Sequence, residues 1–143
     1  MRTIKFRGKH INSGEWMYGD LHLLCDAPHI HMEVSKYPYA GKRAFVAPDS
    51  VGQFTGLFDK NNKEIYEGDL LSSPLSEVNP FGMVAWHPNG YFFIDTKFGK
   101  QTPTEDHRTL GEMLNYKIGS RSTEFEVVGN IYDNPEMLEG GDQ

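Results

Sequence analysis

The chain has 143 residues and a formal net charge of −6, and 38% of its residues are hydrophobic and 13% aromatic. Its single cysteine, Cys25, excludes an internal disulfide and suits a reducing compartment. No window approaches the roughly 18 apolar residues of a membrane span, and the start MRTIKFRGK holds no apolar segment of signal-peptide length. We therefore expect a compact cytoplasmic protein without a membrane segment, whose aromatic content favours strands.

The negative charge is concentrated toward the C-terminus. Residues 1–50 carry seven Lys and Arg against five Asp and Glu, residues 51–100 carry four against six, and residues 101–143 carry three against nine, which gives +2, −2 and −6. This acidic balance argues against non-specific nucleic-acid binding over the whole surface, although a local basic face remains possible.

Short extended segments dominate the first 50 residues. The pattern predicts strands at Thr3–Arg7, Trp16–Leu24, Ile30–Val34 and Ala44–Ala47, with a break at Ala27-Pro28 and a loop over Pro38–Arg43. Residues two apart in a strand share a face, so the second segment should present one face made of Trp16, Tyr18, Asp20, His22 and Leu24.

Cations alternate with apolar residues in the first segment. Lys5, Arg7 and Lys9 should point to solvent, and Ile4 and Phe6 should point inward. A functional interpretation is a small ridge that contacts phosphates. The simpler interpretation is a solvated strand face, or a sheet edge kept soluble by cations.

The stretch from Val51 to Leu71 predicts three strands joined by a tight turn and a bend. Asn62 lies in the polar turn segment, and Asn tolerates the left-handed backbone that a hairpin turn requires. Gly68 interrupts the extended pattern and predicts a bulge or a sharp bend. Asp69 follows at once, and its side chain is expected to accept backbone hydrogen bonds there.

The rest of the chain adds a hairpin, a helix and a last strand. Met83–Trp86 and Tyr91–Thr96 should pair across an Asn-Gly turn, Pro74–Gly82 should be a loop, and Lys97–Arg108 is a polar connection. Thr109 and Glu112 have capping-box spacing, which predicts a short packing helix. The remaining elements are a strand over Thr123–Tyr132 and one helical turn after Asn134-Pro135.

Three motifs in this order resemble the YopX family of phage and prophage proteins, and together they span nearly the whole chain. They are Ile4–Lys9 followed by Trp16 and Gly19, then Gly52–Leu57 followed by Glu64–Asp69, then Val127–Glu136. Asn62 stands where the family usually has a turn glycine.

The resemblance implies a mainly β fold, in which an SH3-like barrel is joined to a further β-rich part. We expect an N-terminal β-rich part over 1–50 and the barrel part, with the one helix, over 51–143. The resemblance also implies a phage or prophage origin in a bacterial host cell, no established activity, and oligomers.

Candidate site residues are few. His29 and His31 could share a strand face, with His22 and Cys25 nearby in sequence, but the spacing matches no recognised zinc pattern. Glu64, Glu67 and Asp69 cluster without a partnering acid or base, and no phosphate-binding glycine loop or nucleophile elbow occurs. We therefore expect no catalytic residue, no cofactor and no metal ligand.

Two functions remain. The first is a non-enzymatic, homo-oligomeric binding or assembly module that contacts a phage or host protein through strand edges or exposed aromatic residues. The second is a small nucleic-acid-binding accessory protein of phage replication or regulation, which rests on fold analogy. A basic groove lined by Lys5, Arg7, Lys9, Lys42 and Arg43 would support the second function, as would base stacking on an exposed Tyr91 or Phe92. The net negative charge favours the first function and makes nucleic acid an unlikely partner.

Overall fold

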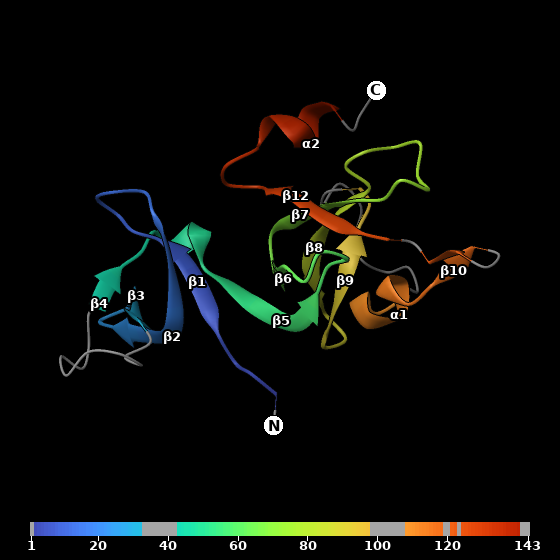
Figure 1. The fold of residues 1–143 in the computed structure, drawn as a ribbon. Helices are drawn as coiled ribbons and strands as arrows, with labels where there is room; N and C mark the ends of the chain where they lie inside the picture. The colour runs from blue at the N-terminus through green and yellow to red at the C-terminus, as the bar shows by residue number, and fades with distance from the viewer. Residues whose placement is uncertain (1, 33–42, 98–107, 119–120, 123, 141–143) are drawn as a thin grey trace. The chain divides into compact units, whose positions relative to one another are not determined.

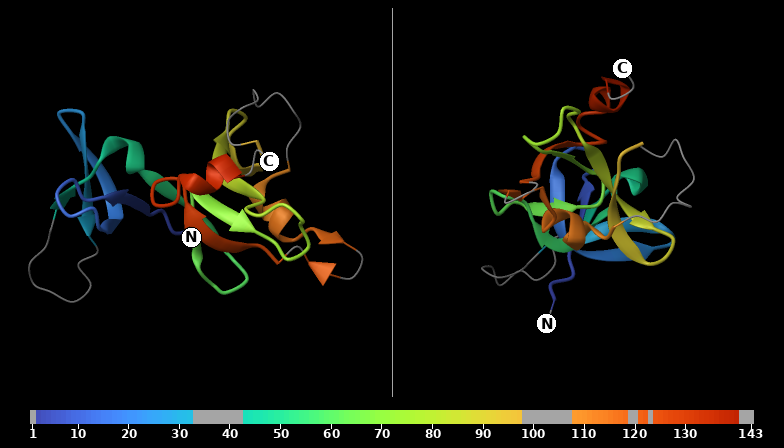
Figure 2. Two further views of the ribbon diagram at one scale, coloured as in Figure 1. Left: turned by 90° about the horizontal axis from the view of Figure 1, so that it is seen from above. Right: turned by 90° about the vertical axis from the view of Figure 1, so that its right-hand side faces the viewer.

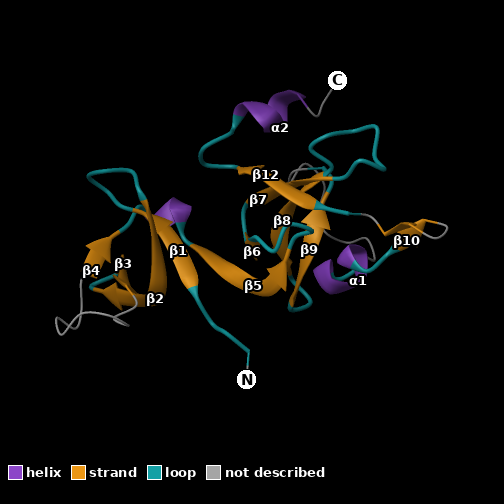
Figure 3. Ribbon diagram, viewed as in Figure 1, coloured by secondary structure: helices purple, strands orange, loops and turns teal. Residues whose placement is uncertain are grey.

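A computed structural model describes residues 2–32, 43–97, 108–118, 121–122 and 124–140. Strands make up most of the regular structure, which confirms the predicted mainly β fold (Figure 3). The chain divides into two compact units, Met1–Gly56 and Leu57–Gln143, called here the N-terminal unit and the C-terminal unit. The sequence placed the boundary between residues 50 and 51, and the two units divide between Gly56 and Leu57.

The N-terminal unit consists of antiparallel strands (Figure 1). Its elements are β1 (Phe6–Lys9), β2 (Trp16–Leu24), β3 (Ala27–Met32), β4 (Arg43–Phe45) and the 3-10 helix η1 (Pro48–Ser50). They are followed by β5 (Gly52–Phe58), which contains the boundary between the units, and the sheet order is β4-β3-β2-β1-β5-β6. Its buried apolar residues among those described include Ile30, Ala44, Val46 and Phe54.

A two-residue turn joins β2 to β3. Cys25 and Asp26 have φ angles of 51° and 65°, which is the backbone of a tight hairpin turn, and Leu24 pairs at once with Ala27. The expected break at Ala27-Pro28 is therefore wrong. Pro28 removes one backbone donor from β3, and its carbonyl accepts a hydrogen bond from the Val46 amide at 3.2 Å.

The C-terminal unit contains a four-stranded antiparallel sheet with the order β12-β7-β8-β9, which can be followed by colour in Figures 1 and 2. Its strands are β6 (Glu64–Tyr66), β7 (Asp69–Ser72), β8 (Gly82–His87), β9 (Tyr91–Asp95), β10 (Lys117–Ile118), β11 (Arg121–Ser122) and β12 (Glu126–Asn130). Its helices are α1 (Leu110–Leu114) and α2 (Glu136–Gly140). One core cluster is made of Ile65, Leu71, Val84, Ile94, Leu110 and Phe125.

The two predicted hairpins in this region are confirmed, and the helix has the predicted start. Asn62 has a φ of 63° in the turn between β5 and β6, and Gly90 has a φ of 92° in the turn between β8 and β9. Thr109 and Glu112 form the predicted capping box, and Leu110 is buried. The antiparallel pairing of β10 with β11 was not predicted. Most of the predicted Pro38–Arg43 and Lys97–Arg108 loops lies outside the described residues, and the SH3-like barrel stays a prediction.

Gly68 is the sharp bend that the sequence predicts. Its φ is 92°, a left-handed value that side chains beyond glycine rarely adopt. Its amide donates to the Val84 carbonyl at 2.8 Å, and its carbonyl accepts from the Ile131 amide at 3.0 Å. Asp69 accepts a hydrogen bond from the Tyr66 amide at 2.7 Å through Oδ2, as expected, although this carboxylate is only 1% exposed. The bend thus redirects the chain from β6 into β7 with its backbone groups paired.

We expect Gly68→Val to lower the free energy of unfolding by more than the ~0.5–1 kcal/mol of a simple glycine effect, because a β-branched residue is strained at positive φ. Urea unfolding of the full chain measures this. Gly111→Ala is the matched control: its added Cβ would lie 3.9 Å from Leu57 Cδ1, an ordinary contact, so stability should stay level or rise by up to ~1 kcal/mol. A Gly68→Val curve that overlays the wild-type curve would contradict the proposed constraint.

Candidate functional site

Three histidines converge on one face of the N-terminal sheet. His22 on β2 is the direct cross-strand partner of His29 on β3, and His31 lies two residues further along β3. Side chains two apart in a strand point to the same face, and directly paired residues do so as well. The register of one hairpin therefore brings together two histidines that the sequence singled out and a third that it named only as a neighbour.

The rings are close enough to interact. The Nε2 atoms of His29 and His31 are 3.1 Å apart. The His22 ring stacks on both of the others. Its centroid lies 4.0 Å from that of His31, with the ring planes at 23°, and 5.5 Å from that of His29, with the ring planes at 18°. One ligand nitrogen from each of the three rings falls within 4.8 Å of the others. We call these residues the histidine cluster.

Exposure is graded across the histidine cluster. His29 is only 4% exposed, His31 is half-buried and His22 is exposed. Nδ1 of His29 is buried, and it has no hydrogen-bond partner among the residues that the structure describes. An unsatisfied buried polar atom costs about 1–3 kcal/mol, so this ring is not explained by packing alone.

The surroundings of His31 favour its neutral ring. Burial lowers the pKa of His31 from its ordinary value, and charge on His22, His29 and Arg43 lowers it further. Asp20, which pairs with His31 across the strands, acts in the opposite direction. A His31 with a lowered pKa is neutral at pH 7, and the neutral ring keeps the lone pair that binds a metal or accepts a proton.

Cys25, the other residue considered for a metal site, is exposed at the turn between β2 and β3 and is not among the converging residues. Sequence reasoning missed the cluster because the expected break at Ala27-Pro28 separated His22 from His29. The positive-φ turn at Cys25 and Asp26 sets the register in which β2 pairs with β3. The dipeptide Cys-Asp is a much weaker sequence signal for a hairpin turn than Asn-Gly. The expectation of no metal ligand stays untested.

Two of the carboxylates singled out from the sequence, Glu64 and Asp69, make local hydrogen bonds to Tyr66. Glu64 accepts a hydrogen bond from the Tyr66 hydroxyl at 3.2 Å, and Asp69 is held by the Tyr66 amide. Both contacts are structural. They explain why the Glu64–Asp69 motif can shape the bend without taking part in catalysis.

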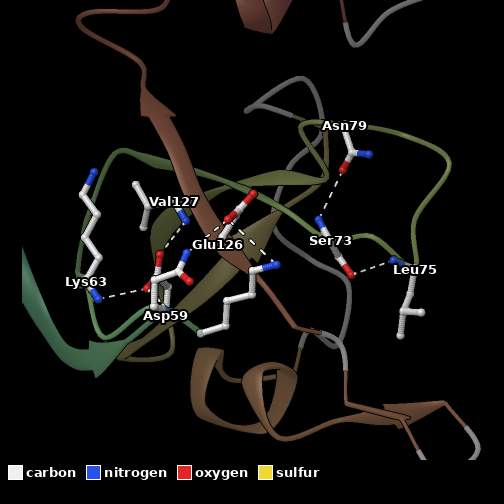
Figure 4. Close-up of polar contacts among 9 residues, drawn as sticks. Asp59, Lys63, Ser73, Leu75, Asn79, Glu126 and Val127 are labelled. Carbon is white, nitrogen blue, oxygen red and sulfur yellow. Dashed lines mark hydrogen bonds and ion pairs between the residues drawn. The ribbon is translucent and has the colours of Figure 1, made fainter.

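A further buried carboxylate, Asp59, joins the first turn of the C-terminal unit to its last strand (Figure 4). Its Oδ1 accepts from the amides of Asn61 at 2.8 Å and Lys63 at 2.9 Å. Its Oδ2 accepts from the Val127 amide on β12 at 2.9 Å. One side chain thus closes the β5–β6 turn and fixes β12 beside it.

The cations on β1 do not form the exposed ridge that was considered. Arg7 is 5% exposed and its guanidinium lies 4.5 Å from the Trp16 ring centroid, whereas Ile4 is 56% exposed. Lys9 lies over the same ring at 5.5 Å, and Lys5 lies over Phe54 at 5.5 Å. The expected directions are therefore wrong for Arg7, which is buried, and for Ile4, which is exposed. Aromatic rings on the neighbouring strands lie against the cations.

The fold defines a class of small, mainly β proteins whose described residues form a six-stranded, a four-stranded and a two-stranded sheet. A family model described as YopX protein matches residues 5–139, so the chain belongs to the YopX family. A crystal structure of protein EF1440 from Enterococcus faecalis has a similar fold, with a TM-score of 0.54 and 21% identity over 96% of this chain and 99% of that chain. The curated proteins contain no match to this chain. Among the described residues, no helix has the length and apolar character to cross a membrane.

We expect Asp59→Asn to destabilise the protein by about 1–3 kcal/mol, because one of the two oxygens that accept backbone amides is replaced by a donor. Chemical unfolding followed by circular dichroism measures the change. Glu126→Gln is the control: Glu126 makes a 3.9 Å ion pair with Lys60 at the surface, so its loss should cost less than about 1 kcal/mol. If the two substitutions lowered the free energy of unfolding equally, the Asp59 hydrogen bonds would contribute no more to stability than a surface ion pair.

Proposed function

We propose that this YopX protein is a non-enzymatic binding module, encoded by a phage or prophage, that associates with a second copy of itself to assemble on its targets. The observation that carries this proposal is an aromatic side chain, Trp86, held in an exposed position on β8. Exposed large aromatic residues anchor protein interfaces far more often than an average surface residue does.

Trp86 is 52% exposed, and its cross-strand partner on β9 is Phe92. The two rings meet edge to face, with centroids 4.8 Å apart at 73°. Phe92 is half-buried and packs against the core cluster. The exposed indole of Trp86 therefore packs on the Phe92 ring, which in turn packs against the core cluster. This packing restricts the indole before binding, so less side-chain entropy is lost when a partner covers Trp86.

The charge distribution supports a second copy as the partner. The N-terminal unit carries seven Lys and Arg against five Asp and Glu, or +2. The C-terminal unit carries seven against fifteen, or −8. Units of opposite sign on different copies attract one another, whereas two C-terminal units repel. This favours contacts in which the N-terminal unit of one copy meets the acidic unit of another.

Nucleic-acid binding is less well supported. Of the five cations considered for a basic groove, Arg7 is buried, Lys5 and Lys9 are half-buried over aromatic rings, Arg43 is exposed on β4, and Lys42 lies outside the described residues. Tyr91 and Phe92, considered for base stacking, are half-buried, and Tyr91 already stacks on His87 at 4.5 Å. Catalysis also has little support, because the carboxylates of the Glu64–Asp69 motif hold backbone and hydroxyl groups.

Self-association should appear at high micromolar concentration and weaken as salt rises, because opposite charges on the two units are screened. Trp86→Ala should raise the dissociation constant by roughly thirtyfold, the equivalent of about 2 kcal/mol for an interface anchor. Light scattering and sedimentation velocity over a concentration and salt series measure both effects.

Val78→Ala is the matched control for Trp86→Ala. Val78 is 56% exposed on the loop after β7, so its truncation removes exposed apolar surface of similar accessibility away from the aromatic pair. We expect the control to associate as the wild type does. A wild-type protein that remains monomeric at high micromolar concentration would rule out the proposed assembly.

We expect duplex DNA to bind no tighter than the weak non-specific range of about 10⁻⁴ M at physiological salt, because few cations face solvent together. Fluorescence anisotropy with labelled duplex and single-stranded DNA across a salt series tests this. Submicromolar binding that weakens steeply with salt would instead establish the accessory-protein function. Salt-insensitive binding that prefers single strands would indicate stacking on aromatic side chains.

A further inference from the structure

The histidine cluster on β2 and β3 has the spacing of a transition-metal site. Two imidazole nitrogens that bind one tetrahedral zinc ion at about 2.0–2.1 Å lie roughly 3.3 Å from each other. The Nε2 atoms of His29 and His31 are already 3.1 Å apart. The third ligand nitrogen lies within 4.8 Å of them, so it must approach by at most about 1.5 Å, which a side-chain rotation can provide.

The exposure of each ring suits that arrangement. His29 is buried and its position is fixed between β2 and β4, while His22 is exposed and able to turn toward an ion. The buried ring and the half-buried His31 form the inner side of the site. The outer side faces solvent, so a water molecule would complete a tetrahedral coordination of three histidines.

We propose that His22, His29 and His31 together bind one divalent transition-metal ion, with zinc as the best fit. Three imidazole ligands favour zinc, cobalt, nickel or copper, whereas magnesium and calcium prefer oxygen ligands. This inference goes beyond the proposed self-association: the three ligands belong to the N-terminal unit, whereas Trp86 belongs to the C-terminal unit.

Two charged residues face the cluster from neighbouring strands. Asp20 and Arg43 are both register partners of His31, on β2 and β4 respectively. Their charges oppose one another in sign, so the local field neither attracts nor repels a cation strongly. The affinity therefore depends on the imidazole nitrogens, and removal of one ligand should weaken binding more than removal of either charge.

Calorimetric titration of the full-length, chelator-treated protein with zinc chloride tests the proposal. We expect one zinc ion per chain in the micromolar range or tighter, and no heat with magnesium chloride under the same conditions. His22→Asn and His31→Asn should each weaken zinc binding at least tenfold, because each removes a ligand. These two positions are preferred to His29, since an exposed or half-buried residue can be replaced with less risk to folding.

Ile30→Val is the control variant. Ile30 is buried between the two β3 histidines in sequence but points to the opposite face of the strand, so it perturbs β3 without removing a ligand. Zinc affinity should remain within a factor of two or three of the wild type, about the scatter of context effects. Circular dichroism of each variant checks that the fold is retained.

Nuclear magnetic resonance of the histidine rings in the wild-type protein supplies a second measurement that needs no variant. Zinc should shift the ring signals of His22, His29 and His31 and leave those of His10 and His87 in place. The proposal is overturned if zinc binds no tighter than magnesium, if the titrations of His22→Asn and His31→Asn superimpose on the wild type, or if the signals of His10 or His87 shift instead.

Discussion

The bend at Gly68 and Asp69 is the constraint on which the C-terminal unit depends. The chain must leave β6 and enter β7, which belongs to another sheet, within two residues. Only a residue that tolerates a φ of 92° can do this, and the next carboxylate then satisfies the Tyr66 amide inside the protein. The same glycine pairs its backbone with Val84 and Ile131, so one bend fixes the places of β8 and of the segment after β12.

Two buried carboxylates of the C-terminal unit therefore serve the scaffold: Asp69, which belongs to a family motif, and Asp59, which lies between two motif segments. The carboxylates of Asp59 and Asp69 accept hydrogen bonds from backbone amides. Replacing a buried carboxylate that accepts such bonds lowers the stability of the fold. Function has to be sought where side chains are held in place without an evident structural need. Among the described residues, Trp86 on β8 and the histidine cluster on β2 and β3 meet this description.

Both positions are products of cross-strand register. Trp86 is supported because it pairs with Phe92, and the histidines converge because His22 pairs with His29. A slip of one residue in either hairpin would send these side chains to the opposite face. The rigid hairpins thus supply the preorganisation that binding a partner or an ion requires.

Much of the local structure could be read from the sequence. The β2 strand, the turn at Asn62, the bend at Gly68 and the capping box at Thr109 each depend on a few adjacent residues whose backbone preferences are strong. The burial of Arg7, the hairpin turn at Cys25 and Asp26, and the meeting of the three histidines could not be predicted in this way. They depend on which strands become neighbours and in which register. That choice is made by packing across the sheet, where residues distant in sequence decide what covers a cation or places one ring beside another.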